Sequence, residues 1–78
     1  MKKQVYRVLR RILRRHLIAS GQLIPRRRLS AVLGSREERN ELYCDVEQAL
    51  QVQLEDAELG QVETFGQLAA YVERRLAA

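Results

Sequence analysis

The spacing of apolar residues predicts three amphipathic helices and no strands. Over residues 3–18, apolar side chains recur at i, i+3, i+4 and i+7, the pattern of one helical face. Residues 36–50 and 65–76 repeat this pattern. The three stripes consist of Val5, Val8, Leu9, Ile12, Leu13 and Leu17; of Leu42, Tyr43, Val46, Ala49 and Leu50; and of Phe65, Leu68, Ala69, Val72 and Leu76.

Polar residues mark where the predicted helices begin and end. Ser35 with Glu38, and Thr64 with Gln67, have the spacing of capping boxes. In a capping box, the first side chain accepts a hydrogen bond from the backbone three residues on, and the second side chain reaches back. Gly21 is expected to end the first helix in a left-handed conformation, since glycine adopts positive φ without strain.

The connections complete a small helical bundle. Residues 22–34 form a long loop in which Pro25 breaks any helix, and a helical spacing near its end adds one or two turns. Residues 55–59 before Gly60 predict a short helical turn. We therefore expect one all-α domain over residues 1–78, with three main helices, one short helix and a long loop between the first two main helices.

Charge changes this picture because the two signs are unevenly distributed. Residues 1–28 contain ten lysines and arginines and no acid, whereas residues 29–78 contain four arginines against ten acids, a net of −6. Either the basic end binds an anionic partner, or it is neutralised internally by acidic neighbours. The candidate anion-binding residues of the first helix are Arg7, Arg10, Arg11, Arg14 and Arg15.

Length and motifs argue against an enzyme. A chain of 78 residues buries a thin core and leaves little room for a large cleft. The sequence has no glycine-rich phosphate loop, catalytic triad pattern or metal-ligand spacing, so we expect no metal, and His16 is expected to be structural. The single cysteine, Cys44, excludes an internal disulfide and fits a cytoplasmic setting. No stretch is long and apolar enough to span a bilayer. We also expect the protein to be a monomer.

The second half of the chain follows a known order of motifs. Glu41-Leu42, Val46-Glu47, Leu50 and Leu54 are followed by the acidic turn 55–58 and by the run 62–72. In this order and spacing, the chain resembles the acyl carrier proteins and the related carrier domains of polyketide and peptide synthesis. Leu33-Gly34 resembles the Leu-Gly that precedes the modified serine of that family. The resemblance covers essentially the whole chain and implies the same bundle.

The resemblance also implies a function. Carrier proteins are not enzymes: a transferase attaches 4′-phosphopantetheine to a serine at the start of the second main helix. The thiol of that arm holds acyl intermediates as thioesters for fatty-acid, polyketide or related synthesis. Partner enzymes dock on the same helix. On this basis Ser35 is the candidate attachment residue, and the candidate docking residues are Arg36, Glu37, Glu41, Asp45 and Glu47.

Two alternatives to a working carrier stay open. The family pattern is Leu-Gly-x-Asp-Ser-Leu, whereas this chain has Leu33-Gly34-Ser35-Arg36-Glu37-Glu38 and is one residue shorter before Glu41-Leu42. In the first alternative, Ser35 is simply a helix cap, and the chain is a carrier-fold protein that holds no prosthetic group and acts as a protein-interaction module. The second alternative is a basic nucleic-acid-binding module. The acids of the 36–50 helix argue against that helix as a groove reader, so we do not expect nucleic acid as the main partner.

Overall fold

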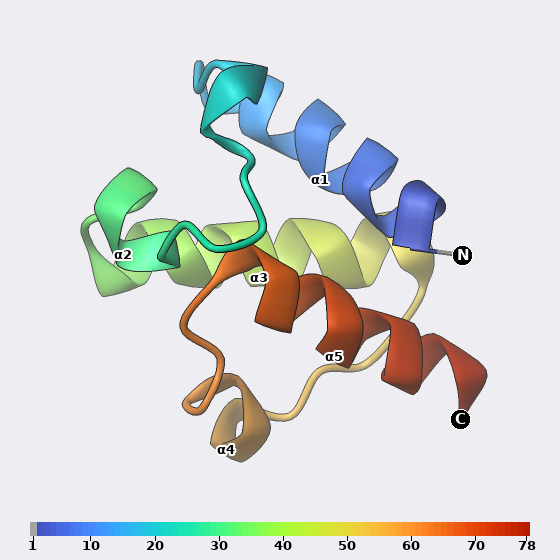
Figure 1. Cartoon of the computed structure of the whole chain (residues 1–78). Coiled ribbons are helices and arrows are strands. Elements are labelled where there is room, and N and C mark those ends of the chain that lie inside the picture. Colours follow the sequence, from blue (N-terminus) through green and yellow to red (C-terminus); the bar gives the residue numbers. More distant parts are fainter. Residues whose placement is uncertain (1) are drawn as a thin grey trace.

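The computed structural model describes residues 2–78, and for residue 2 the backbone only. The elements in chain order are α1 (Lys2–Arg15), the 3₁₀ turn η1 (Ser20–Gln22), α2 (Leu29–Val32), α3 (Arg36–Leu50), α4 (Asp56–Leu59) and α5 (Phe65–Ala77). No strand forms within residues 2–78, and the only strand-like pairing there is an isolated antiparallel bridge between Arg28 and Thr64. The prediction of a small all-α bundle is confirmed, with the extra turn before Gly34 present as α2 (Figure 1).

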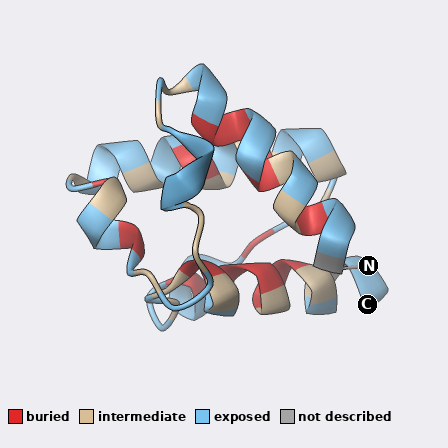
Figure 2. Ribbon diagram, turned by 45° about the horizontal axis from the view of Figure 1, so that its top comes forward, coloured by how far each residue is buried: buried red, intermediate tan, exposed pale blue. Residues whose placement is uncertain are grey.

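The three long helices form the core by turning their apolar stripes toward one another. α1 packs against both α3 and α5, and the buried positions face inward (Figure 2). Burying a leucine or phenylalanine side chain stabilises a fold by about 1.5–3 kcal/mol, so these stripes supply most of the favourable free energy. The core consists of Val5, Leu9, Ile12, Leu13, Leu29, Leu33, Leu42, Val46, Leu54, Leu59, Phe65, Leu68, Ala69, Tyr71 and Val72.

Three stripe positions that the periodicity predicts to be buried are exposed. Ala49 and Leu76 lie in the last turns of α3 and α5, where the bundle covers less of each helix. The third, Leu17, is 95% exposed and lies beyond the end of α1. Periodicity alone extends a stripe to the last apolar residue, whereas burial depends on whether a neighbouring element reaches that turn.

The end of α1 corrects both the predicted boundary and the predicted terminator. The helix ends at Arg15 rather than at Ile18, and Leu17 rather than Gly21 has the positive φ, at 61°. The amide of Ile18 donates to the carbonyl of Leu13 at 2.9 Å, and that of Leu17 to the carbonyl of Arg14 at 3.0 Å. This pair of bonds is the Schellman termination. It turns half-buried Ile18 back onto the core and leaves Leu17 outside.

Replacing Leu17 by glycine is expected to stabilise the protein. A side chain in the left-handed region costs about 1–2 kcal/mol, which glycine avoids, while its greater freedom in the unfolded chain takes part of that gain back. We therefore expect Leu17→Gly to raise the free energy of unfolding by about 0.5–1 kcal/mol in urea denaturation. Ala19→Gly is the control, because Ala19 has a φ of −63° and should lose stability on the same change. Equal losses at both positions would contradict the strain at Leu17.

The long connection is held firmly against the start of α5. Its backbone makes three hydrogen bonds there: Leu29 N to Glu63 O at 2.8 Å, Phe65 N to Arg27 O at 3.1 Å, and Gly66 N to Pro25 O at 2.8 Å. These bonds fix the path of the chain into α2. They thereby set where Gly34 and Ser35 meet the first turn of α3.

Candidate functional site

Ser35 is the N-cap of α3, and both of its predicted capping hydrogen bonds are present. Its Oγ accepts from the backbone N–H of Glu38 at 3.1 Å, and its own N–H donates to Glu38 Oε1 at 3.2 Å. The hydroxyl also donates to Glu38 Oε1 at 3.0 Å. The Ser35 hydroxyl is therefore engaged as donor and acceptor by a single glutamate, and its side chain is half-buried rather than free in solvent.

A groove of about 890 Å³ opens beside this helix start, between α2, α3, α4 and the chain that follows α4. Its apolar lining comes from Leu29, Tyr43, Leu54, Leu59 and Val62. Arg36, which directly follows Ser35, contributes its side chain to the lining. The capped start of α3 and the groove are thus adjacent, and the groove combines apolar walls with polar side chains.

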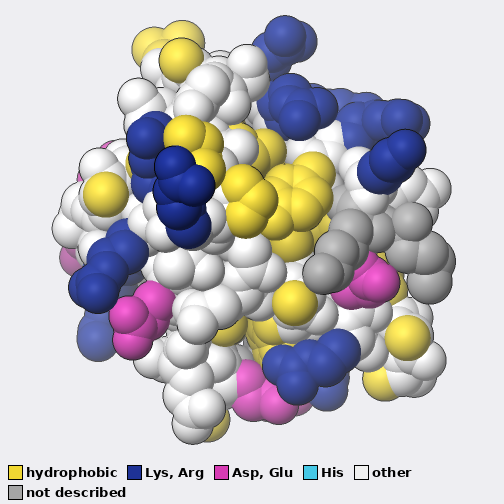
Figure 3. All heavy atoms as spheres, viewed as in Figure 1, with side chains coloured by type: hydrophobic (Ala, Val, Ile, Leu, Met, Phe, Trp, Pro, Cys, Tyr) yellow, Lys and Arg dark blue, Asp and Glu magenta, His cyan; other side chains and the backbone are white. Residues whose placement is uncertain are grey.

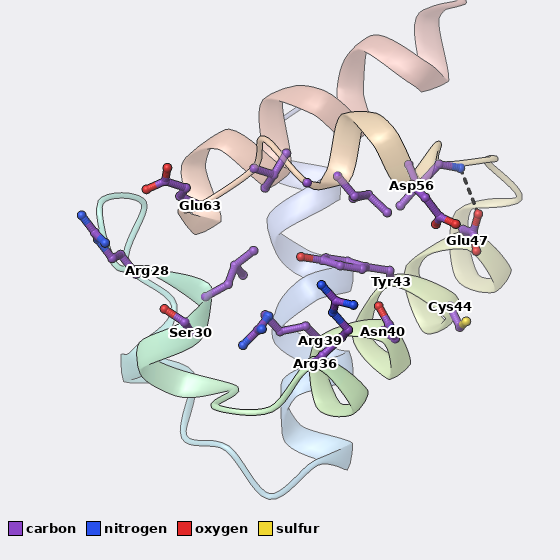
Figure 4. A pocket seen from close by; sticks show the side chains of 15 residues that line it. Arg28, Ser30, Arg36, Arg39, Asn40, Tyr43, Cys44, Glu47, Asp56 and Glu63 are labelled. Carbon is purple, nitrogen blue, oxygen red and sulfur yellow. Dashed lines mark hydrogen bonds between the residues drawn. The ribbon is translucent and has the colours of Figure 1, made fainter.

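The charged side chains of the groove lie in its middle and at its two ends (Figure 4). The Arg36 and Arg39 side chains lie next to each other in its middle, beside the ring of Tyr43. Arg28 and Glu63 lie at one end, and Glu47 and Asp56 lie at the other. Arg39 donates to the carbonyl of Leu33 at 2.8 Å, and neither central arginine forms an ion pair within residues 2–78. An anionic group entering the middle would meet two guanidinium groups.

Partial burial raises the pKa of the Tyr43 phenol, and the nearby Arg39 guanidinium opposes that rise. The phenol is therefore neutral at physiological pH and presents a hydrogen-bond donor to the groove. Together with the two guanidinium groups, it supplies hydrogen-bond donors to the middle of the groove.

α4 is held in place as the far wall of the groove by Tyr71 of α5. The Tyr71 hydroxyl accepts from the amide of Glu55 at 2.9 Å and donates to Glu58 Oε1 at 2.8 Å. Burial raises the pKa of this hydroxyl. Glu47 secures the preceding segment by accepting from the amide of Leu54 at 2.9 Å (Figure 4). Sequence reasoning missed these links because the partners are 16, 13 and 7 residues apart.

The five candidate docking residues do not share one surface. Arg36 and Glu47 line the groove, and Glu37 is exposed in the first turn of α3. Glu41 and Asp45 instead face the end of α1, where His16 lies. Exposed Glu37 and Glu41, one turn apart, form the outer ridge of α3, and the Glu41 end of this ridge lies beside His16.

His16 links α1 to α3. Its Nε2 lies 3.0 Å from Asp45 Oδ2, and its Nδ1 lies 3.9 Å from Glu41 Oε2. The expectation that His16 is structural was based on the lack of acids at nearby sequence positions. The fold supplies those acids from 29 residues away, so the sequence held no local signal for this contact.

The candidate anion-binding arginines of α1 all lie on its exposed side. No group of three or more histidine, cysteine, aspartate or glutamate side chains in the described chain is placed to hold a metal ion. Within residues 2–78, no helix combines the length and apolar character needed to cross a bilayer. No protein-family model matches the sequence, and no similar curated protein is found.

Proposed function

We propose that this chain is a non-enzymatic protein of acyl-carrier type, with Ser35 as the attachment residue for a 4′-phosphopantetheine arm. The observation that carries the proposal is the adjacency of the Ser35 cap and the groove, whose lining includes the next residue, Arg36. A tethered acyl group needs a hydroxyl at a fixed point and an apolar space within reach. The apolar walls of the groove offer that space to the acyl chain.

The start of α3 supplies favourable electrostatics for a phosphodiester. Free backbone N–H groups and the positive end of the helix dipole stabilise an anion at a helix N-terminus. Arg36 and Arg39 add guanidinium groups, whose hydrogen bonds to phosphate oxygens are charge-assisted. Glu37 and Glu38 in the first turn oppose this effect. Partner enzymes would approach the arm over the outer ridge of α3 and contact Glu37 and Glu41 through basic side chains.

A second form of the proposal is favoured by the capping box itself. Attaching an arm removes the hydroxyl hydrogen that Ser35 donates to Glu38, and it places a second negative charge beside that carboxylate. A protein with the same fold that keeps the cap intact would hold no arm. It would act only by docking to partner proteins through α3.

Mass spectrometry of the intact protein distinguishes the two forms. After incubation with coenzyme A and a broad-specificity phosphopantetheinyl transferase, we expect the wild type to gain the mass of one arm. Ser35→Ala should gain nothing, and Ser30→Ala, which alters a serine lining the groove, should gain as much as the wild type. Because the Ser35 cap contributes about 0.5–2 kcal/mol, circular dichroism must show that Ser35→Ala remains folded. Absence of any gain with several transferases would contradict the arm and leave the docking form.

A further inference from the structure

The outward face of α1 carries an arginine stripe that the carrier-type function does not use. Its side chains recur at i, i+3, i+4, i+7 and i+8, and all of them are exposed. They are Arg7, Arg10, Arg11, Arg14 and Arg15. Figure 3 shows lysine and arginine side chains gathered along α1, at the upper right. With exposed Lys3 included, this arginine stripe extends over about 18 Å of helix.

The arginine stripe has no counter-charge on its own element. None of its five members forms an ion pair within the described chain, where the ion pairs involve His16 and Arg75. Like charges at i and i+4, such as Arg7 with Arg11 and Arg10 with Arg14, destabilise a helix. No carboxylate of α1 offsets this repulsion. An anion from outside the chain would offset it, so the stripe is suited to bind one.

We propose that the arginine stripe binds the phosphate backbone of duplex DNA, without reading the bases. Guanidinium groups match the geometry of phosphate oxygens and bind them in a bidentate manner. Duplex DNA presents about one negative charge per 1.7 Å of its axis, so a stripe of this length meets several phosphates at once. The inference goes beyond the carrier-type function and does not depend on Ser35.

Other occupants fit the arginine stripe less well. Insertion into an anionic membrane needs an apolar face, and that of α1 is buried in the core, with Leu9 and Ile12 both 0% exposed. An interface with an acidic protein needs an apolar or aromatic centre, and the stripe consists only of arginines. Single strands bind through exposed aromatic side chains, whereas Tyr6, the aromatic residue of α1, is half-buried against the core.

The neighbouring acids limit where DNA can lie. Glu41 and Asp45 of α3 flank the C-terminal end of α1 beside His16. A duplex is therefore repelled on the α3 side and held on the outward side, away from the start of α3. A carrier partner would instead dock on this acidic α3 side, through Glu37 and Glu41.

Fluorescence anisotropy of the full chain with a labelled DNA duplex tests the proposal. Each neutralised phosphate contributes about −0.9 to the slope of log affinity against log salt, so five contacts predict a slope of about −4 to −5. Affinity should then fall roughly 500-fold between about 50 and 200 mM salt. Arg10→Gln/Arg14→Gln should reduce the magnitude of the slope by about 2. Arg26→Gln/Arg74→Gln removes the same net charge from exposed positions outside α1 and should leave the slope unchanged.

Several results would overturn the proposal. Equal weakening by the two double variants would mean that binding follows net charge and not the arginine stripe. Affinity without salt dependence, or no binding at low salt, would exclude phosphate contacts. Tighter binding to an RNA duplex, to polyglutamate or to phosphatidylglycerol vesicles would assign the stripe to that occupant instead. Arg10→Gln/Arg14→Gln should accept phosphopantetheine as well as the wild type does. A failure of the DNA-binding proposal can therefore be told apart from a failure of the carrier proposal.

Discussion

Leu9→Ala is expected to destabilise the protein by about 2–5 kcal/mol, the range for removing a buried leucine side chain and leaving a cavity. Leu9 is 0% exposed and lies in the middle of α1, the helix that packs on both α3 and α5. Small domains are stable by only about 5–15 kcal/mol in total, and 78 residues place this chain toward the lower end. The substitution should therefore remove a large share of the stability, measured as a lower urea midpoint by circular dichroism.

Leu17→Ala is the matched control, because it deletes the same atoms from a leucine of the same predicted stripe. Leu17 is 95% exposed, and surface substitutions usually change stability by no more than about 0.5 kcal/mol. We expect the two variants to differ by at least about 1.5 kcal/mol. Similar losses would mean that α1 continues to Ile18 in solution and packs Leu17 inside, as the periodicity alone predicts.

Gly66→Ala is expected to destabilise the protein by about 1–3 kcal/mol, although it replaces a glycine within a helix. By helix propensity alone, the change should stabilise α5 by about 1 kcal/mol. The fold reverses the sign, since a Cβ at position 66 would lie 2.9 Å from the carbonyl oxygen of Pro25 and 3.3 Å from its Cβ. That carbonyl also accepts a hydrogen bond from the Gly66 amide at 2.8 Å. Moving the loop away would relieve the clash but would break this hydrogen bond.

Gly21→Ala provides the comparison for this result. No atom lies within 4 Å of a Cβ built at Gly21, and its φ is not positive. The substitution should stabilise the protein by about 0.4–1 kcal/mol by reducing the freedom of the unfolded chain. Chemical denaturation of both variants measures whether each substitution raises or lowers the free energy of unfolding. A stabilised Gly66→Ala protein would show that the 22–34 connection can leave α5 at no cost.

The caps and stripes could be predicted because they depend on residues that are close in sequence. Ser35 with Glu38 and Thr64 with Gln67 form their capping boxes three residues apart, as the residue types indicate. The start of α3 and the buried positions Leu42 and Val46 follow from the same local rules. The helix start that holds the candidate residue Ser35 could likewise be placed, because the capping serine marks the boundary of α3.

The features that the sequence did not reveal depend on contacts between distant segments. The Schellman turn that exposes Leu17 forms where Ile18 meets the core. The pairing of His16 with Asp45 joins residues 29 positions apart. The groove exists only where α2, α3 and α4 converge, and its far wall depends on Tyr71 of another helix.

Local sequence patterns are enough to specify a bundle of capped amphipathic helices with a basic first third. Hydrophobic periodicity and capping are short-range effects, and residues three or four positions apart suffice to specify them. Tertiary packing places the groove beside the Ser35 cap, leaves no room for a side chain at Gly66, and leaves the α1 arginines without an ion-pair partner within residues 2–78. Each of these depends on which distant elements come within contact distance, and that distance is set by how the three stripes pack together.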